Sequence, residues 1–138
     1  MIHQERFSME TTGRGLYELS AQIQEKVGAS GIRMGLCHLY LHHTSAALIL
    51  CENADPSVRT DLESFFQRLV RDGDPVFTHR NEGPDDMSAH IRTILTGMTL
   101  SLPITEGRCA LGTWQGIFLY EHRSGTHQRR LTLTLNGE

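Results

Sequence analysis

Hydrophobic positions recur along this chain with two different spacings, which divide it into helices and strands. Helical spacing predicts three helices, over Leu16 to Val27, from Pro56 to about Val70, and from near Asp86 to the residue before Gly97. For the first helix, Thr11 or Thr12 is available as a cap and Gly28 as a stop. The second has the clearest boundary, because Asp55 is a good N-cap and proline suits the first helical position. On the third, Met87, Ile91, Ile94 and Leu95 are expected to face inward.

The remaining apolar segments indicate strands. They are Met1–Met9 as an edge strand, Met34–His43, Ala46–Cys51, Met98–Thr105, Arg108–Leu111, Trp114–Glu121 and Arg129–Leu135. In the last of these, leucines at 131, 133 and 135 alternate with threonines, as in a strand with one buried face. Strands joined by hairpins with two to three helices between them predict an antiparallel, β-sandwich-like α+β fold. A single domain over residues 1–138 suits this length.

Charge and composition narrow the functional classes. A net charge of -3 gives no electrostatic argument for nucleic acid or an anionic membrane as a partner. The first ten residues contain charges and no apolar core of a signal peptide, and the longest apolar run, Ala46–Cys51, is too short to span a bilayer. Three cysteines without a CxxC pair argue against a disulfide framework and a cysteine zinc site. We therefore expect a soluble cytoplasmic protein.

Two polar segments flank the apolar strand Ala46–Cys51. Before it, His43 and Ser45 share one face of an extended chain, and we take His43 rather than His42 as the candidate site histidine. After it, Glu52 and Asn53 lie at a strand-to-helix corner, where functional groups are often presented. Solvation of Glu52 and a turn hydrogen bond from Asn53 would explain these two residues equally well.

Two further segments hold candidate chemistry. Asp86 and His90 are four residues apart, so they lie on one helical face and can orient a proton-transfer histidine or hold a metal. In the segment Gly112–Arg123, regular strand geometry places Trp114 on the face opposite to Gln115 and Glu121, so one pocket cannot take all three within one chain. Core packing is the alternative explanation for the single Trp.

Histidines and carboxylates suggest a metal site. His43, His79 and His90, with Glu52 or Asp86, would suit zinc or a similar ion. Magnesium, held by carboxylates and the phosphates of a substrate, would need fewer dedicated ligands. No spacing such as HExxH decides between these alternatives.

In their order along the chain, these segments resemble the YjbQ family, whose members are secondary thiamine-phosphate synthases. The matching strings are HTSAALILCENADPSVRTDLE (43–63), EGPDDMSAHIRT (82–93), LGTWQGIFLYEHR (111–123) and RRLTLTLNGE (129–138). The chain departs from the family pattern at Ser88, where proline is usual, and at Arg92, where lysine is frequent. The loop Ser124–Gln128 also lacks a common glycine pair.

The resemblance implies a homotrimer with pockets shared between subunits, and the joining of a pyrimidine pyrophosphate to a thiazole phosphate as a weak or secondary activity. A leaving pyrophosphate needs its charge neutralised by metal and basic side chains. On this hypothesis His43, His90 and Asp86 are catalytic, and Glu52, Asp85 and Asp86 lie on the metal side. The substrate-binding candidates are Ser45, Asn53, Arg92, Trp114, Gln115, Glu121 and Arg123. Arg92 and Arg123 are the candidate phosphate clamps among them, with surface ion pairs as the alternative explanation.

Two other functions fit the same residues. A metal-dependent hydrolase would use His43, His79 and His90 around a bound ion with an open position. A non-catalytic trimer that binds a small phosphorylated metabolite is the third hypothesis.

Overall fold

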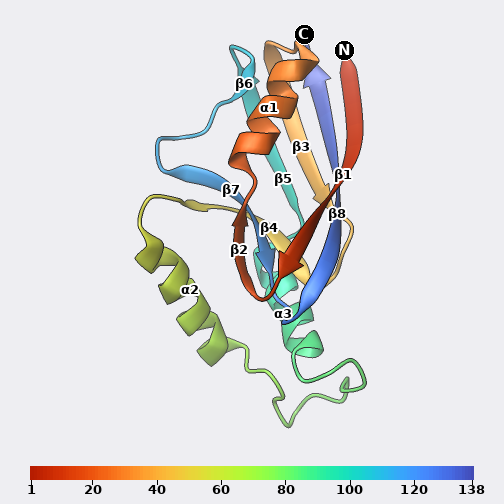
Figure 1. Ribbon diagram of the computed structural model, residues 1–138, viewed down its shortest axis with the longest axis vertical. Helices are drawn as coiled ribbons and strands as arrows, with labels where there is room; N and C mark the ends of the chain where they lie inside the picture. The colour runs from red at the N-terminus through yellow and green to blue at the C-terminus, as the bar shows by residue number, and fades with distance from the viewer.

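The computed structural model describes all 138 residues as two antiparallel sheets with three helices (Figure 1). The elements are β1 (Ile2–Thr12), β2 (Gly15–Glu18), α1 (Ser20–Ser30), β3 (Met34–Leu41), β4 (Ala46–Glu52), α2 (Pro56–Leu69), α3 (Asp86–Thr96), β5 (Thr99–Thr105), β6 (Arg108–Cys109), β7 (Gln115–Glu121) and β8 (Thr126–Gly137). One sheet has the order β1-β8-β3-β5-β6 and the other the order β2-β7-β4. The predicted α+β fold is confirmed, and β1 is the edge strand that the sequence predicts.

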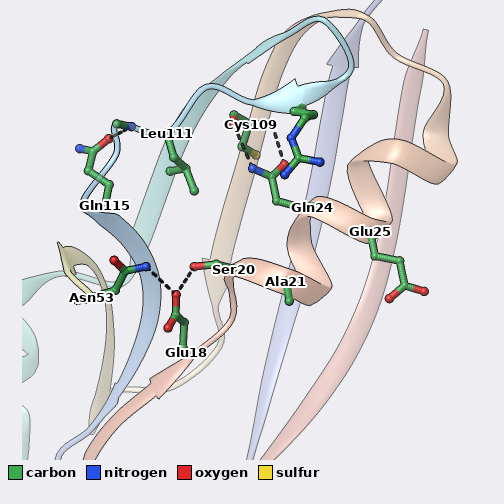
Figure 2. Close-up of a pocket in the computed structure, with 11 residues that line it drawn as sticks. Glu18, Ser20, Ala21, Gln24, Glu25, Asn53, Cys109, Leu111 and Gln115 are labelled. Atoms are coloured by element: carbon green, nitrogen blue, oxygen red, sulfur yellow. Dashed lines mark hydrogen bonds between the residues drawn. The ribbon is translucent and has the colours of Figure 1, made fainter. Parts of the chain in front are cut away.

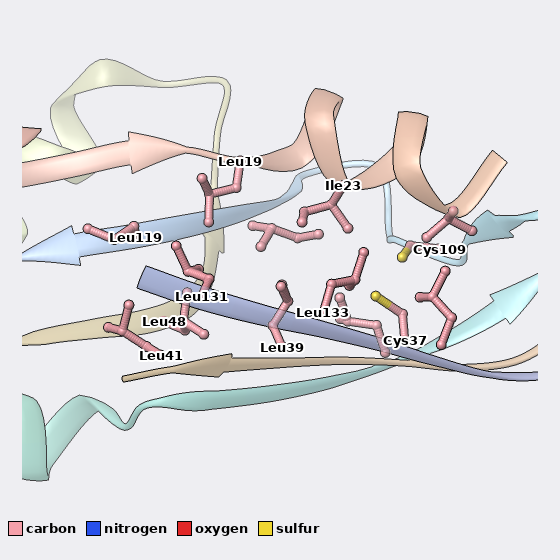
Figure 3. Close-up of a cluster of buried hydrophobic side chains, with 14 of the residues drawn as sticks. Leu19, Ile23, Cys37, Leu39, Leu41, Leu48, Cys109, Leu119, Leu131 and Leu133 are labelled. Atoms are coloured by element: carbon pink, nitrogen blue, oxygen red, sulfur yellow. The ribbon is translucent and has the colours of Figure 1, made fainter. Parts of the chain in front are cut away.

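The hydrophobic core lies between the two sheets and under α1 (Figure 3). The alternating leucines of β8, at positions 131, 133 and 135, are fully buried as predicted. Facing them from the smaller sheet are Leu48 of β4 and Leu119 of β7. Burying such side chains stabilises the fold by about 1.5–3 kcal/mol each.

The first helix begins later than predicted. Residues Gly15–Glu18 form β2, in which Leu16 pairs with Tyr120 of β7, and α1 starts at Ser20. The helix also ends at Gly31, which adopts the left-handed conformation (φ 77°), rather than at Gly28. Pairing with a strand a hundred residues away therefore overrides the local helical spacing at Leu16.

Helices α2 and α3 begin where the sequence predicts, but they are packed differently from expectation. The Asp55 carboxylate caps α2 by accepting a hydrogen bond from the Ser57 backbone N–H at 2.9 Å, yet no residue of α2 is fully buried. The expectation that Ile94 and Leu95 of α3 face inward is wrong, since both are exposed, and Ala89, Arg92 and other residues of the opposite face are buried instead. Arg92 lies on this buried face and pairs with Glu63 of α2.

The helices and the cysteines complete the description of the fold. None of the three helices combines the length and apolar character that crossing a membrane requires. All three cysteines are free thiols, and Cys37 and Cys109 are buried.

Candidate metal centre

Two histidines converge on one carboxylate oxygen at the start of α3. Asp86 Oδ2 lies 2.7 Å from His79 Nε2 and 3.0 Å from His90 Nε2, and the two rings are 5.6 Å apart. His90 reaches Asp86 because the residues are four apart on the helix, as predicted. The connection between α2 and α3 brings His79 to the same point. One ligand atom from each residue lies within 4.8 Å of the other two, which is close enough for all three to hold one ion.

The other nitrogen of His90 fixes the orientation of its ring. Nδ1 lies 2.9 Å from the backbone carbonyl oxygen of Thr44. Because a carbonyl only accepts hydrogen bonds, Nδ1 carries a proton, and in the neutral ring Nε2 then turns its lone pair toward Asp86. Two acceptors facing each other are unfavourable unless a proton or a metal cation lies between them. Donation from the second ring nitrogen to a carbonyl is also the usual support for a metal-binding histidine.

A second layer of charge holds Asp86 in place. Its Oδ1 lies 3.2 Å from Arg123 Nη1, and Arg123 also donates to Asp85 and to the Glu82 carbonyl. Burial raises the pKa of Asp86, but the hydrogen bond from His79 and the charges of His90 and Arg123 outweigh burial and lower this pKa below its ordinary value. Asp86 is therefore ionised at neutral pH, as a metal ligand must be.

Solvent and small molecules can reach the two histidines. The side chain of His79 is 43% exposed and that of His90 is 28% exposed, whereas that of Asp86 is 8% exposed. His79 and Arg80 line a cavity of about 410 Å³ within the connection between α2 and α3. A separate cavity of about 310 Å³, between Thr44 and Met98, is lined by His90. The cluster thus has a buried carboxylate and accessible imidazoles.

The structure does not bring the other two predicted metal ligands to this cluster. His43 Nε2 accepts a hydrogen bond from the Arg130 backbone N–H at 2.8 Å. Burial, and then the charges of Arg129 and Arg130, lower the pKa of His43, which keeps the ring neutral. Glu52 accepts hydrogen bonds from the backbone N–H groups of Ala54 and Asp55, so it closes the turn before α2. Neither His43 nor Glu52 shares an ion with His79 and His90 in this arrangement.

Ser45 and Glu121 belong to a buried ion-pair network. Glu121 is fully buried and accepts hydrogen bonds from Arg129 and from the Thr11 hydroxyl. Burial raises the pKa of Glu121, but the bonds from Arg129 and Thr11 outweigh it and lower the pKa. Arg129 also donates to the Ser45 hydroxyl at 3.1 Å. This network ties β4 and β7 to β8 and leaves neither Ser45 nor Glu121 open to a substrate.

Arg92 is not placed to bind a phosphate from solvent, contrary to the prediction. Its side chain is fully buried, and Nη1 donates to Glu63 of α2 at 3.2 Å. Nη2 lies 3.4 Å from the Val70 carbonyl oxygen, and the guanidinium stands over the Phe66 ring. Arg92 therefore joins α3 to α2. An ion pair, the alternative explanation from the sequence, describes Arg92 better than a contact with a substrate phosphate.

Three predicted substrate-binding residues lie at the far end of the smaller sheet. Gln115 begins β7, Trp114 precedes it and is 61% exposed, and Asn53 follows β4. At about 3.4 Å per residue, the seven-residue strand β7 separates this end from the Glu121 end by about 20 Å. Trp114 is therefore not a core residue, and within one chain Asn53 and Gln115 do not share a cavity with the histidine cluster.

Known proteins resemble this chain over nearly its full length. A family model described as UPF0047 protein YjbQ-like matches residues 5–138. The chain belongs to this family. A UPF0047 protein of Synechocystis is 48% identical over 136 residues, which cover 99% of this chain and 92% of that protein. UPF0047 protein YjbQ of Salmonella typhimurium is 42% identical over 139 residues, which cover all of both proteins.

A solved structure agrees with the YjbQ fold seen here. A hypothetical protein from Aeropyrum pernix K1 superposes with a TM-score of 0.89 at 27% identity and covers 99% of both chains. The predicted family resemblance is thus confirmed over nearly the full length.

In this YjbQ-family chain, some contributors to the cluster had no distinctive signal in the sequence. The Thr44 carbonyl is a backbone group, so only a fold could show that it orients His90. Arg80 stands beside His79 in a long connection, and the length of that connection is the one signal that could have drawn attention to it.

Proposed function

We propose that His79, Asp86 and His90 of this chain hold one divalent metal ion, and that the chain is a metal-dependent enzyme acting on a small phosphorylated metabolite. The observation that carries the proposal is the paired contact of His79 Nε2 and His90 Nε2 with one oxygen of Asp86, while the Thr44 carbonyl keeps the proton of His90 on Nδ1. Two imidazole nitrogens favour zinc or a similar transition ion over magnesium, which prefers oxygen ligands.

The surroundings of the three ligands suit an anionic substrate. When bound, the ion supplies positive charge to a substrate oxygen as a Lewis acid. Arg80 lines the cavity next to His79, and its Nε and Nη2 are held by backbone carbonyls of Phe77 and Pro75. Arg80 can therefore present its remaining Nη1 to a phosphate. Arg123 acts differently, since Asp85, Asp86 and the Glu82 carbonyl engage its guanidinium, and it positions Asp86.

The transferase reaction implied by the family resemblance is the first reaction to test. Joining a pyrimidine pyrophosphate to a thiazole phosphate releases pyrophosphate, whose growing charge Arg80 and the metal would neutralise. Hydrolysis of a phosphorylated substrate is the second candidate. It is favoured by a site with three protein ligands and accessible imidazoles, which is the ligand number that catalytic zinc sites use. The homotrimer expected from the resemblance stays a prediction.

The decisive experiment separates metal binding from turnover. Metal-stripped protein is titrated with Co²⁺, whose visible absorption reports nitrogen ligands, and then with Zn²⁺ by calorimetry. We expect one ion per chain, and at least a hundredfold loss of affinity in His79→Ala, Asp86→Asn and His90→Ala. His3→Ala, an exposed histidine on β1, is the matched control and should bind like the wild type.

Turnover is then measured with both substrate classes, with and without metal. Thiamine phosphate formation that is lost on metal removal and in Asp86→Asn supports the transferase, and release of phosphate from simple esters supports the hydrolase. Metal binding without turnover of any tested substrate would favour the non-catalytic metabolite-binding alternative. Unchanged metal affinity in all three ligand variants would refute the centre itself.

A further inference from the structure

A large cavity lies apart from the histidine cluster. It has a volume of about 890 Å³ and opens between α1, β6 and the segment that leads into β7 (Figure 2). Its volume lies within the range of small-molecule sites. Gln115 lines the cavity, so the cavity lies at the start of β7. The length of this strand places the cavity about 20 Å from Glu121, and the histidine cluster lies at the Glu121 end.

One end of the cavity presents anchored acceptors. Glu18 Oε2 accepts hydrogen bonds from Asn53 Nδ2 at 3.1 Å and from the Ser20 hydroxyl at 2.8 Å (Figure 2). These bonds hold the carboxylate in place, and the Asn53 Oδ1 atom has no donor within the chain. The nearest cation, Arg59, is 3.8 Å from Glu18 Oε1, at the limit of an ion pair. A fixed carboxylate and a free amide oxygen side by side suit a ligand ammonium group.

The backbone of the GTWQG segment is shaped to allow this arrangement. A Cβ at position 116 would lie 2.9 Å from Glu18 Oε2, 3.0 Å from Asn53 Cβ and 2.8 Å from the Phe118 ring. Only glycine leaves room there for Glu18 and Asn53 to meet. Gly116 thus leaves room both for the Phe118 ring and for the acceptor pair.

Two other residues of the lining present donors. Gln115 Oε1 accepts a hydrogen bond from the Gly112 N–H at 2.7 Å, which fixes the side-chain amide and leaves its Nε2 group without a partner (Figure 2). Arg108, next to Cys109 on β6, lines the same cavity and makes no hydrogen bond or ion pair within the chain. A free guanidinium and a free amide N–H suit a carboxylate.

The rest of the lining includes the Glu25 carboxylate and the Gln24 amide. Gln24 donates to the Cys109 carbonyl at 3.0 Å and accepts from the Cys109 N–H at 2.8 Å, so it fastens β6 to α1. Ala21 and Leu111 add apolar surface to the same wall. A ligand in the cavity therefore meets both charged groups and an apolar surface.

We infer that this cavity binds a small zwitterion of the amino-acid class, with its ammonium group at Glu18 and Asn53 and its carboxylate at Arg108. Acidic and basic side chains in one lining fit such a ligand better than a simple anion, because Glu18 and Glu25 would repel an anion bound close to them. The inference does not depend on the metal centre, which lies at the other end of β7.

The test is a series of ω-amino acids of increasing length, from glycine to 6-aminohexanoate, measured by calorimetry with the full chain. At least one member should bind, and butylamine and butyrate, which each have one of the two charges, should bind at least tenfold more weakly. Glu18→Gln and Arg108→Gln should each weaken the best ligand at least tenfold. Gln at position 18 can still accept the bonds from Ser20 and Asn53, so the variant removes charge while keeping the anchors.

Matched controls remove charges outside the cavity. Asp61→Asn on α2 and Arg71→Gln after it should leave ligand affinity unchanged, and the melting temperature of each variant shows whether it is folded. The inference fails if no zwitterion binds at millimolar concentration. It also fails if butyrate or butylamine binds as well as the best zwitterion, or if Glu18→Gln has no effect. Because His90→Ala leaves this cavity intact, loss of the metal centre and failure of this site are distinguishable.

Discussion

Asp85 should stabilise the loop that supports the metal centre, and replacing it with Asn tests this through pH. The buried carboxylate accepts hydrogen bonds from the Ser124 N–H at 2.8 Å and hydroxyl at 3.0 Å, and it pairs with Arg123. Burial raises the pKa of Asp85, but the bonds from Ser124 and Arg123 outweigh it and lower the pKa from 3.8 to about 2. That difference corresponds to roughly 2 kcal/mol of folding free energy at neutral pH.

The sign of the pH dependence follows from the lowered pKa. The folded state holds Asp85 ionised more firmly than the unfolded state does, so its contribution is complete above the unfolded pKa and disappears as pH falls through about 2. About half of it should remain at pH 3. Asp85→Asn should therefore destabilise the protein by roughly 2 kcal/mol at pH 7 and by about half as much at pH 3.

Urea denaturation at the two pH values measures these differences. Far-ultraviolet circular dichroism is the appropriate signal, because the single Trp is 61% exposed and reports folding poorly. Asp61→Asn, an exposed acid on α2, is the control and should change stability little at either pH. A destabilisation by Asp85→Asn that is the same at pH 7 and pH 3 would show that the charge of Asp85 is not the cause and would refute the reasoning.

Three further predictions concern packing, the ion pair and assembly. Gly116→Ala should cost about 1–3 kcal/mol in urea denaturation because its Cβ would press on the Phe118 ring, and equal stability would contradict this. Arg92→Met should lower the free energy of unfolding by about 2 kcal/mol through loss of the ion pair with Glu63, and should leave Co²⁺ affinity unchanged. Loss of substrate affinity without destabilisation would instead support Arg92 as a phosphate clamp. Light scattering should give three times the 15.5 kDa chain mass if the expected trimer forms.

The parts of the fold that local chemistry decides were predictable from the sequence. Alternating leucines in β8 could face only one side, and Asp55 followed by Pro56 could begin only a helix. At Leu16, by contrast, the spacing fitted a helix, and the pairing of β2 with β7 across a hundred residues decided for a strand. Such pairing leaves no trace in the local pattern.

The third helix shows a different limit of prediction from sequence. Apolar periodicity assumes that the apolar face is the buried one, but α3 buries Arg92 and exposes Ile94. Glu63, on another helix, makes burial of the guanidinium tolerable by pairing with it. Which charged residue finds a buried partner depends on tertiary contacts, so the sequence could not indicate the rotation of α3.

The candidate site was predictable where its residues share an element and unpredictable where they do not. Asp86 and His90 meet because they are four apart on one helix. His43 and Ser45 lie on the same side of the chain, as their spacing predicts, but both face β8. There His43 contacts Arg130 and Ser45 contacts Arg129. The position of His79 depends on how a connection of sixteen residues folds back, from 70 to 85, which spacing cannot determine.

The register of β4 and β7 explains why the four motif segments lie at two ends of the smaller sheet rather than at one. These strands are antiparallel, with Ala46 opposite Glu121 and Glu52 opposite Gln115. The segment before β4 must therefore lie beside the segment after β7, next to α3 and the histidine cluster. By the same geometry, the segment after β4 must lie beside the segment before β7, next to α1. The motifs that identify this family thus form two pairs, and the length of a seven-residue strand keeps the pairs apart within each chain.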